Sequence, residues 1–363
     1  MKSLKSLFVA IAVFCLLGVS AVAQESGLFG LVTLVEAARE DRGLGEDIVQ
    51  TRLYRIDPET AALTEIGPTG FTECSGLDFE PVTNELFAVC RRLELIDPDP
   101  KLKLDPEEEV GDVLVKVDRI TGEAVEIGQL NEMEDRNRRV SDISFRSDGV
   151  LFAHVNDVGF GMAALTTEAV PDNNNSLGII NTQTGRLTIL GPTGFEDTFS
   201  AIGFSLRDNL YHGADDGTMG ALNMLDQTTG NATLMNALAY PDQFDGRNII
   251  GSMDTQPVTN VLFAVLFSQN IDPDPRSSGS EAVDTRAHAP DGFFLLNIDP
   301  ASGNIDLIGQ LSGLENQLTA IAFLDDRRIE VPTLSEYGLI VTVVMLLGAA
   351  VVFLRRRQIK SGI

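Results

Sequence analysis

Acidic side chains dominate the composition of this 363-residue chain. It carries 53 Asp and Glu against 27 Lys and Arg, a formal net charge of −26, with three Cys and three His. A surface of this sign repels nucleic acid and anionic lipid headgroups, so DNA and RNA are excluded as partners and divalent cations or basic partners are favoured. The alternative is that the acidity only keeps an exported protein soluble.

The N-terminus predicts export. Lys2 and Lys5 precede an apolar stretch from Leu7 to Val19, and Ala21-Val22-Ala23 offers the small-x-small pattern that a signal peptidase cleaves. Residues 1–23 are therefore interpreted as a signal peptide, with signal peptidase as a partner. Residues 24–330 form the predicted ectodomain.

A hairpin motif recurs five times in the ectodomain. Each copy has a short apolar strand, a turn that starts with Asp or Asn, and a second short strand; four of the turns contain Thr-Gly or Ser-Gly. Asp and Asn start such turns by bonding nearby backbone N–H groups, and Gly supplies the positive φ that closes them. The copies begin at Leu53, Val115, Ile179, Asn223 and Leu296.

Two further strands follow each of the first four hairpins, one rich in small residues and one with an aromatic residue, as in Leu86-Phe87. The fifth copy stops after the small-residue strand Thr319–Phe323, and an unmatched strand, Leu28–Val32, precedes the first hairpin. Four-stranded units whose last member is completed by the N-terminus predict an all-β, five-bladed β-propeller, with the small-residue strands innermost. A β-sandwich is the alternative, but it explains neither the fivefold period nor the divided unit. The repeats loosely resemble YVTN-type and other NHL-like propeller repeats.

The two cysteines of the mature chain fit this register. Cys74 and Cys90 lie on either side of a predicted turn centred near Val82. We expect them to face each other and form a disulfide in an oxidising compartment, closing a loop of about 15 residues that stabilises the fold by roughly 3 kcal/mol. Two free thiols are the alternative.

Acidic loops occur at one repeated position, between the aromatic strand and the next hairpin. One contains Asp97 and Asp99, and another contains Asp272 and Asp274, each pair in an Asp-Pro-Asp-Pro segment. Carboxylates of this kind suit Ca²⁺, which takes six to eight oxygen ligands, although the spacing differs from that of an EF-hand loop. Calcium is the one cofactor that the sequence suggests, and a solvated acidic loop is the alternative. Loops at one end of a rigid scaffold are also where ligands usually bind.

Catalytic motifs are not found in the sequence. His154, His212 and His288 fall in different units, and nucleophile elbows, zinc-binding His pairs and phosphate-binding loops are lacking. Three carboxylates fall on predicted innermost strands: Asp78 and Asp254 at matching repeat positions, and Asp142 two residues out of register. An exported hydrolase or lyase with carboxylates at the propeller axis is therefore the alternative function.

The C-terminus contains a short motif, an apolar helix and a basic stop. The motif spans residues 331–338, and the apolar run from Leu339 to Leu354 is just long enough to cross a bilayer. The basic tail, residues 355–363, should remain cytoplasmic. The residues that define the signal are Val331, Pro332, Thr333, Leu334, Tyr337, Gly338, Arg355, Arg356 and Arg357.

This tail resembles the IPTL-CTERM sorting signal of Gram-negative bacteria, with Val331 in place of Ile and Tyr337 in place of Trp. The resemblance implies processing by an exosortase-like transpeptidase, and an ordinary membrane anchor is the alternative. We therefore expect a non-enzymatic protein that passes through the inner membrane and periplasm to the cell surface or extracellular matrix. There its loop face would bind a polysaccharide or another surface protein.

Overall fold

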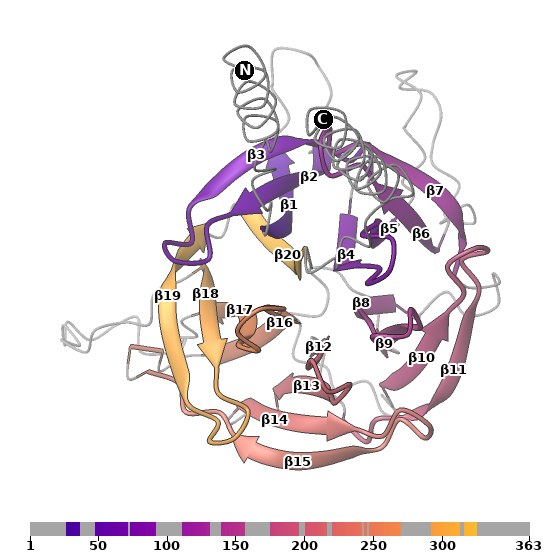
Figure 1. Cartoon of the computed structure of the whole chain (residues 1–363). Helices are drawn as coiled ribbons and strands as arrows, with labels where there is room; N and C mark the ends of the chain where they lie inside the picture. Colours follow the sequence, from indigo (N-terminus) through magenta and orange to yellow (C-terminus); the bar gives the residue numbers. More distant parts are fainter. Residues whose placement is uncertain are drawn as a thin grey trace, which may run out of the picture. The chain divides into compact units, whose positions relative to one another are not determined.

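Five four-stranded antiparallel sheets surround a central axis in the computed structural model (Figure 1). The predicted all-β, five-bladed β-propeller is confirmed for the described part of the chain, and the predicted transmembrane helix lies outside that part. The structure describes residues 27–36, 48–71, 73–91, 111–130, 139–156, 175–195, 200–215, 220–241, 243–244, 247–269, 292–312 and 316–324.

We number the blades in chain order and give the strands of each from the axis outward. Blade 1 contains β4 (Glu73–Phe79), β5 (Leu86–Arg91), β6 (Asp112–Val117) and β7 (Ala124–Gln129). Blade 2 contains β8 (Arg139–Phe145), β9 (Leu151–Asn156), β10 (Ser176–Ile180) and β11 (Leu187–Pro192). Blade 3 contains β12 (Ser200–Phe204), β13 (Leu210–Asp215), β14 (Gly220–Leu225) and β15 (Ala232–Ala237). Blade 4 contains β16 (Arg247–Thr255), β17 (Leu262–Gln269), β18 (Gly292–Ile298) and β19 (Ile305–Ser312).

Blade 5 joins the two ends of the ectodomain. It contains β20 (Asn316–Phe323), β1 (Leu28–Glu36), β2 (Ile48–Ile56) and β3 (Leu63–Pro68). Leu28 pairs with Phe323 at the start of the β1–β20 ladder, and the Leu324 N–H donates to the Gly27 carbonyl at 3.0 Å. The predicted closure by the N-terminal strand is confirmed, with β1 extending beyond the expected Val32.

The antiparallel order gives the ring two different faces. Turns between first and second strands and between third and fourth strands lie on one side, which we call the turn face. Connections between second and third strands, and between blades, lie on the other side, the loop face. The ends at Gly27 and Leu324 both lie on the turn face, because β20 is a first strand and β1 a second strand.

Aromatic residues join neighbouring blades at equivalent positions. A Phe near the start of a second strand meets the Phe at the end of the next blade's innermost strand in an edge-to-face pair, with ring centroids 4.8–5.4 Å apart. Such pairs contribute about 1 kcal/mol beyond the area that they bury. The pairs are Phe29–Phe79, Phe87–Phe145, Phe152–Phe204 and Phe263–Phe323.

Glycines allow close backbone contact at the outer rim. Gly122 closes the β6–β7 turn with φ +84° and rests against Gly67 of the preceding blade. A Cβ on Gly67 would lie 2.2 Å from the Thr121 carbonyl oxygen, so only Gly fits there. The Thr-Gly turns therefore fix the spacing of blades as well as closing hairpins. Ala61 holds the corresponding turn position in blade 5 with φ +60°.

Several predicted segments lie outside the described residues: the signal peptide, the sorting motif, the span from Leu339 to Leu354 and the basic tail. Within the part of the chain that the structure describes, no helix has the length and apolarity to cross a membrane.

Candidate functional site

The innermost strands bring the three predicted aspartates to the propeller axis. Asp78 pairs in register with Phe87, and Asp254 pairs with Phe263, so these two occupy equivalent positions in blades 1 and 4. In blade 2 this position is held by Ser144, and Asp142 lies two residues earlier. The predicted mismatch of Asp142 is therefore confirmed, and the ring of carboxylates is incomplete.

Asp78 joins blades 1 and 2 through backbone N–H groups. Its Oδ2 accepts the Phe145 N–H at 2.5 Å and the Ser144 hydroxyl at 3.3 Å, while its Oδ1 accepts the Phe79 N–H at 2.6 Å. Asp254 repeats this arrangement between blades 4 and 5, accepting the Phe323 N–H at 2.5 Å. Each carboxylate thus accepts hydrogen bonds from N–H groups at the edge of an innermost strand, where those groups have no β-ladder partner.

Asp142 joins three blades. Its Oδ2 accepts the Ile202 N–H of blade 3 at 3.0 Å and the Met253 N–H of blade 4 at 3.4 Å, and its Oδ1 accepts the Ile143 N–H at 3.0 Å. The Ser252 hydroxyl lies 3.4 Å from Oδ1 and accepts the Ile321 N–H of blade 5 at 3.1 Å. Asp142 and Ser252 together therefore connect blades 2 to 5 at the axis.

Burial controls the protonation of these carboxylates. It raises the pKa of Asp78 to about 7, although the N–H groups of Phe145 and Phe79 act in the opposite direction. Burial also raises the pKa of Asp142 well above its usual value. For Asp254 the pKa is raised by burial first, and then by the carboxylates of Asp78 and Asp142. Asp78 thus raises the pKa of both other carboxyl groups, in addition to the effect of their burial.

The axis geometry favours a structural role for these carboxylates over a catalytic one. Asp78, Asp142 and Asp254 all have oxygens that accept backbone N–H groups of neighbouring blades, and Asp78 and Asp142 are buried. A catalytic carboxylate must reach substrate. Among the residues described, no group of three or more His, Cys, Asp or Glu side chains has the arrangement of a metal site.

The predicted disulfide is present. Cys74 and Cys90 pair directly across the β4–β5 ladder, with an S–S distance of 2.06 Å, and both are buried. The turn expected between them is also found: the Glu80 N–H donates to the Glu85 carbonyl at 2.9 Å. The bond therefore closes the loop-face end of an innermost hairpin.

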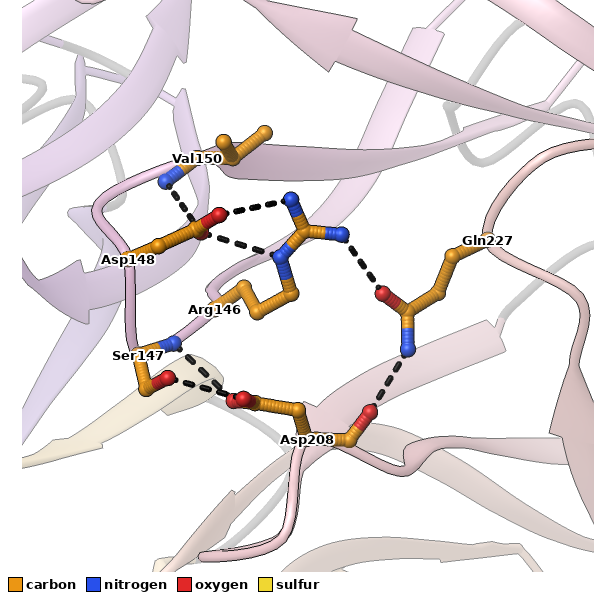
Figure 2. A network of polar contacts seen from close by, with 6 residues as sticks. All are labelled: Arg146, Ser147, Asp148, Val150, Asp208 and Gln227. Carbon is orange, nitrogen blue, oxygen red and sulfur yellow. Dashed lines mark hydrogen bonds and ion pairs between the residues drawn. The ribbon is translucent and has the colours of Figure 1, made fainter.

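Side chains in the turns of blades 2 and 3 bond to one another on the turn face. Figure 2 shows Arg146 of the β8–β9 turn bonded twice to Asp148, at 2.8 and 2.9 Å, and once to Gln227 at 2.9 Å. The amide of Gln227 donates to the Asp208 carbonyl at 2.6 Å, and the Ser147 hydroxyl donates to the Asp208 carboxylate at 2.8 Å. These bonds join the turns of blades 2 and 3, so the side chains in this part of the turn face stabilise the fold.

The loop face carries the longest connections between described strands. Residues 92–110 join β5 to β6, residues 157–174 join β9 to β10, and residues 270–291 join β17 to β18. Each joins a second strand to a third strand, as expected from the repeats. Their predicted calcium ligands, Asp97, Asp99, Asp272 and Asp274, lie outside the described residues, so a calcium site stays a prediction.

One pairing was missed by the sequence analysis, which treated the histidines as scattered. His154 of β9 and His212 of β13 stack between blades 2 and 3, with ring centroids 4.9 Å apart and planes at 25°. Both are fully buried, and His288 lies outside the described residues. The two residues lie one position apart in the second strands of consecutive repeats, fourth in β9 and third in β13. Because side chains alternate along a strand, this offset points them to opposite faces of neighbouring sheets, and it is the signal that could have indicated the pairing.

Comparisons with known proteins find only distant similarity, in solved structures. No protein-family model matches the sequence, and no curated protein matches it. TolB from Acinetobacter baumannii is similar at 12% identity and a TM-score of 0.40; the match covers 77% of this chain, which spans about half (52%) of that TolB chain. A chain of a nidogen/laminin complex is similar at 11% identity and a TM-score of 0.41, with coverage of 82% and 98%.

Proposed function

We propose that this protein is an exported, non-enzymatic surface or matrix protein that binds a partner through its loop face and is delivered through its C-terminal sorting signal. The observation that carries the proposal is the position of the chain ends. The chain leaves the ring at Leu324 on the turn face, and only residues 325–330 separate it from the motif that starts at Val331. The loop face is therefore the side of the ring opposite Leu324, the last described residue of the ring.

Two further observations support export and binding. The Cys74–Cys90 disulfide suits an oxidising compartment outside the cytoplasm. The long connections, residues 92–110, 157–174 and 270–291, start and end on rigid β-ladders at one face. Loops held on a rigid scaffold in this way are the usual place for recognition.

Processing is tested by peptide mapping of the C-terminus in the native host. We expect the mature protein, from surface and medium fractions, to end before Leu339, and a Pro332→Ala variant to retain the apolar span in the inner membrane. Val331→Ile is the matched control, because it moves the motif toward the IPTL pattern and should be processed normally. Mature wild-type protein that still contains Leu339–Leu354 would show that the tail is only an anchor.

Loop-face binding is tested with extracellular polysaccharide isolated from the host and with the isolated surface-protein fraction. We expect the full chain to bind one of these, and replacement of residues 157–174 by a Gly-Ser linker to reduce the affinity at least tenfold. Val258→Ser is the control, because Val258 is exposed in the β16–β17 turn on the opposite face. Equal losses in both variants would contradict binding through the loop face.

An exported hydrolase or lyase is the second candidate, and one observation favours it. The pKa of Asp78, raised to about 7 by burial, is suited to proton transfer at neutral pH. A turnover on host polysaccharide that is abolished in both Asp78→Asn and Asp254→Asn, while both variants remain folded, would establish this function instead.

A further inference from the structure

The interface between blades 2 and 3 is polar at positions where other interfaces are apolar. His154 is the fourth residue of β9, where β5 has Val89 and β17 has Val265. His212 is the third residue of β13, where β9 has Ala153. The other blades have the same fold with apolar residues at these positions, so the fold does not require polar side chains here.

Asn223 extends this polar cluster to a third strand. It pairs in register with His212, as Val115 pairs with Ala88 in blade 1. His212 faces blade 2, because its ring stacks on His154, and the Asn223 side chain lies on the same face of the sheet. Ser200 pairs with Ala214, two residues nearer the loop face than His212, and therefore also lies on that side.

The imidazoles are held in place as neutral groups. The Ser141 hydroxyl lies 2.8 Å from His154 Nδ1, and the Phe195 ring lies 5.5 Å from the ring of His212. Burial lowers the pKa of His212 to about 3, and it lowers that of His154 well below the usual value, with His212 lowering it further. Two uncharged rings that stack in this way do not compete for a counter-ion.

The carboxamide of Asn223 has no hydrogen-bond partner among the residues that the structure describes. Its exposed fraction is 0%, and neither Oδ1 nor Nδ2 has a hydrogen bond with the residues that the structure describes; the same holds for the buried Ser200 hydroxyl. Leaving a buried donor or acceptor unpaired costs about 1–3 kcal/mol. Native proteins avoid this cost by pairing such groups with protein or with ordered water.

We propose that the interface between blades 2 and 3 is a binding site for internal water, held by the Asn223 carboxamide. The site must suit a ligand that both donates and accepts hydrogen bonds, because Oδ1 needs a donor and Nδ2 an acceptor. The ligand must also be very small, because Asn223, His154, His212 and Ser200 are all inaccessible to solvent. Water meets both conditions, and it typically makes about three hydrogen bonds when buried.

A crystal structure of the full chain, at a resolution that shows ordered water, tests the site directly. We expect a water molecule within hydrogen-bond distance of Asn223 Oδ1 or Nδ2, and none at the equivalent Val115 in blade 1. The proposal is overturned if the carboxamide bonds directly to a protein group with no water present. Anomalous density for a transition metal between the rings would also overturn it.

Reciprocal variants at equivalent strand positions provide a second test. Asn223→Val removes the carboxamide together with its water, so the melting temperature should be unchanged or raised. Val115→Asn places a carboxamide among apolar side chains, where we expect the melting temperature to fall by about 4 °C. An equally large fall for Asn223→Val would show that the carboxamide bonds to protein, and would contradict the water site.

Discussion

Aspartates at the axis and at the rim both accept backbone N–H groups, but the axis carboxylates are shielded from water and the rim carboxylates are exposed to it. At the rim, Asp57, Asp226 and Asp299 each accept backbone N–H groups of their own hairpin turn, and these bonds lower their pKa values. The Asp299 pKa is lowered first by the Ser302 hydroxyl. At the axis, Asp78 and Asp142 also accept N–H groups, yet their pKa values are raised.

The difference lies in solvation. A rim carboxylate keeps most of its contact with water, so the stabilisation of its charged form by hydrogen bonds exceeds the small cost of desolvation. An axis carboxylate loses that contact, and the cost of burying its charge exceeds what the N–H groups supply. Hydrogen bonds from backbone N–H groups therefore do not by themselves show whether an Asp side chain is charged.

The largest effect is expected from removing the axis carboxylate that contacts the most blades. Asp142→Ala leaves N–H groups of Ile143, Ile202 and Met253 without an acceptor, which should lower the free energy of unfolding by about 5 kcal/mol. Urea unfolding measures the loss. Asp142→Asn, which keeps one acceptor oxygen and imitates the protonated acid, should lose less than half as much. Equal losses would show that Asp142 acts as a charged group.

The pH dependence of stability separates the axis from the rim. Because the folded pKa of Asp78 is about 7 and its unfolded pKa about 4, the folded state binds the proton more tightly, and the contribution of Asp78 to stability falls as pH rises from 4 to 7. The fall amounts to at most about 4 kcal/mol. Asp78→Asn should remove this contribution, as measured by urea unfolding across this range. The rim variant Asp226→Asn should leave the pH profile unchanged above about pH 5, because the lowered pKa of Asp226 affects stability only at lower pH.

Close packing at the rim is tested by adding a methyl group. A Cβ on Gly128 would lie 2.2 Å from the Thr184 carbonyl oxygen, so Gly128→Ala must push blades 1 and 2 apart and should cost about 2 kcal/mol in the free energy of unfolding. Gly251→Ala is the control, since nothing lies within 4 Å of the added Cβ. If both variants unfold at the same urea concentration, the close contact between Gly128 and Thr184 does not limit the packing of the blades.

The smallest effect is expected at the rim carboxylates themselves. Asp226→Asn keeps an oxygen that can accept the Thr228 and Thr229 N–H groups, each 2.9 Å from the carboxylate. Asn181 already performs this role in blade 2. The melting temperature should therefore stay close to that of the wild type, and a loss comparable to that of Asp142→Ala would remove the distinction between rim and axis.

The sequence by itself determined the elements and their order. Asp and Asn turns, strand pairs and the divided fifth unit are local patterns, because the groups that bond in a hairpin lie a few residues apart. The propeller, its closure through Leu28 and Phe323, and the Cys74–Cys90 bond could all be predicted from them. The three axis aspartates and the register of Asp142 were also predicted correctly.

Only the tertiary structure decided which groups meet between blades. Asp142 and Met253 are 111 residues apart in the chain, and nothing near either residue indicates that the carboxylate accepts that N–H. The stacking of His154 on His212 and the contact of Gly67 with Gly122 are likewise set by how neighbouring sheets pack. Packing depends on the twist and spacing of whole blades, which local sequence patterns do not encode, and so the contacts between blades became visible only in the folded ring.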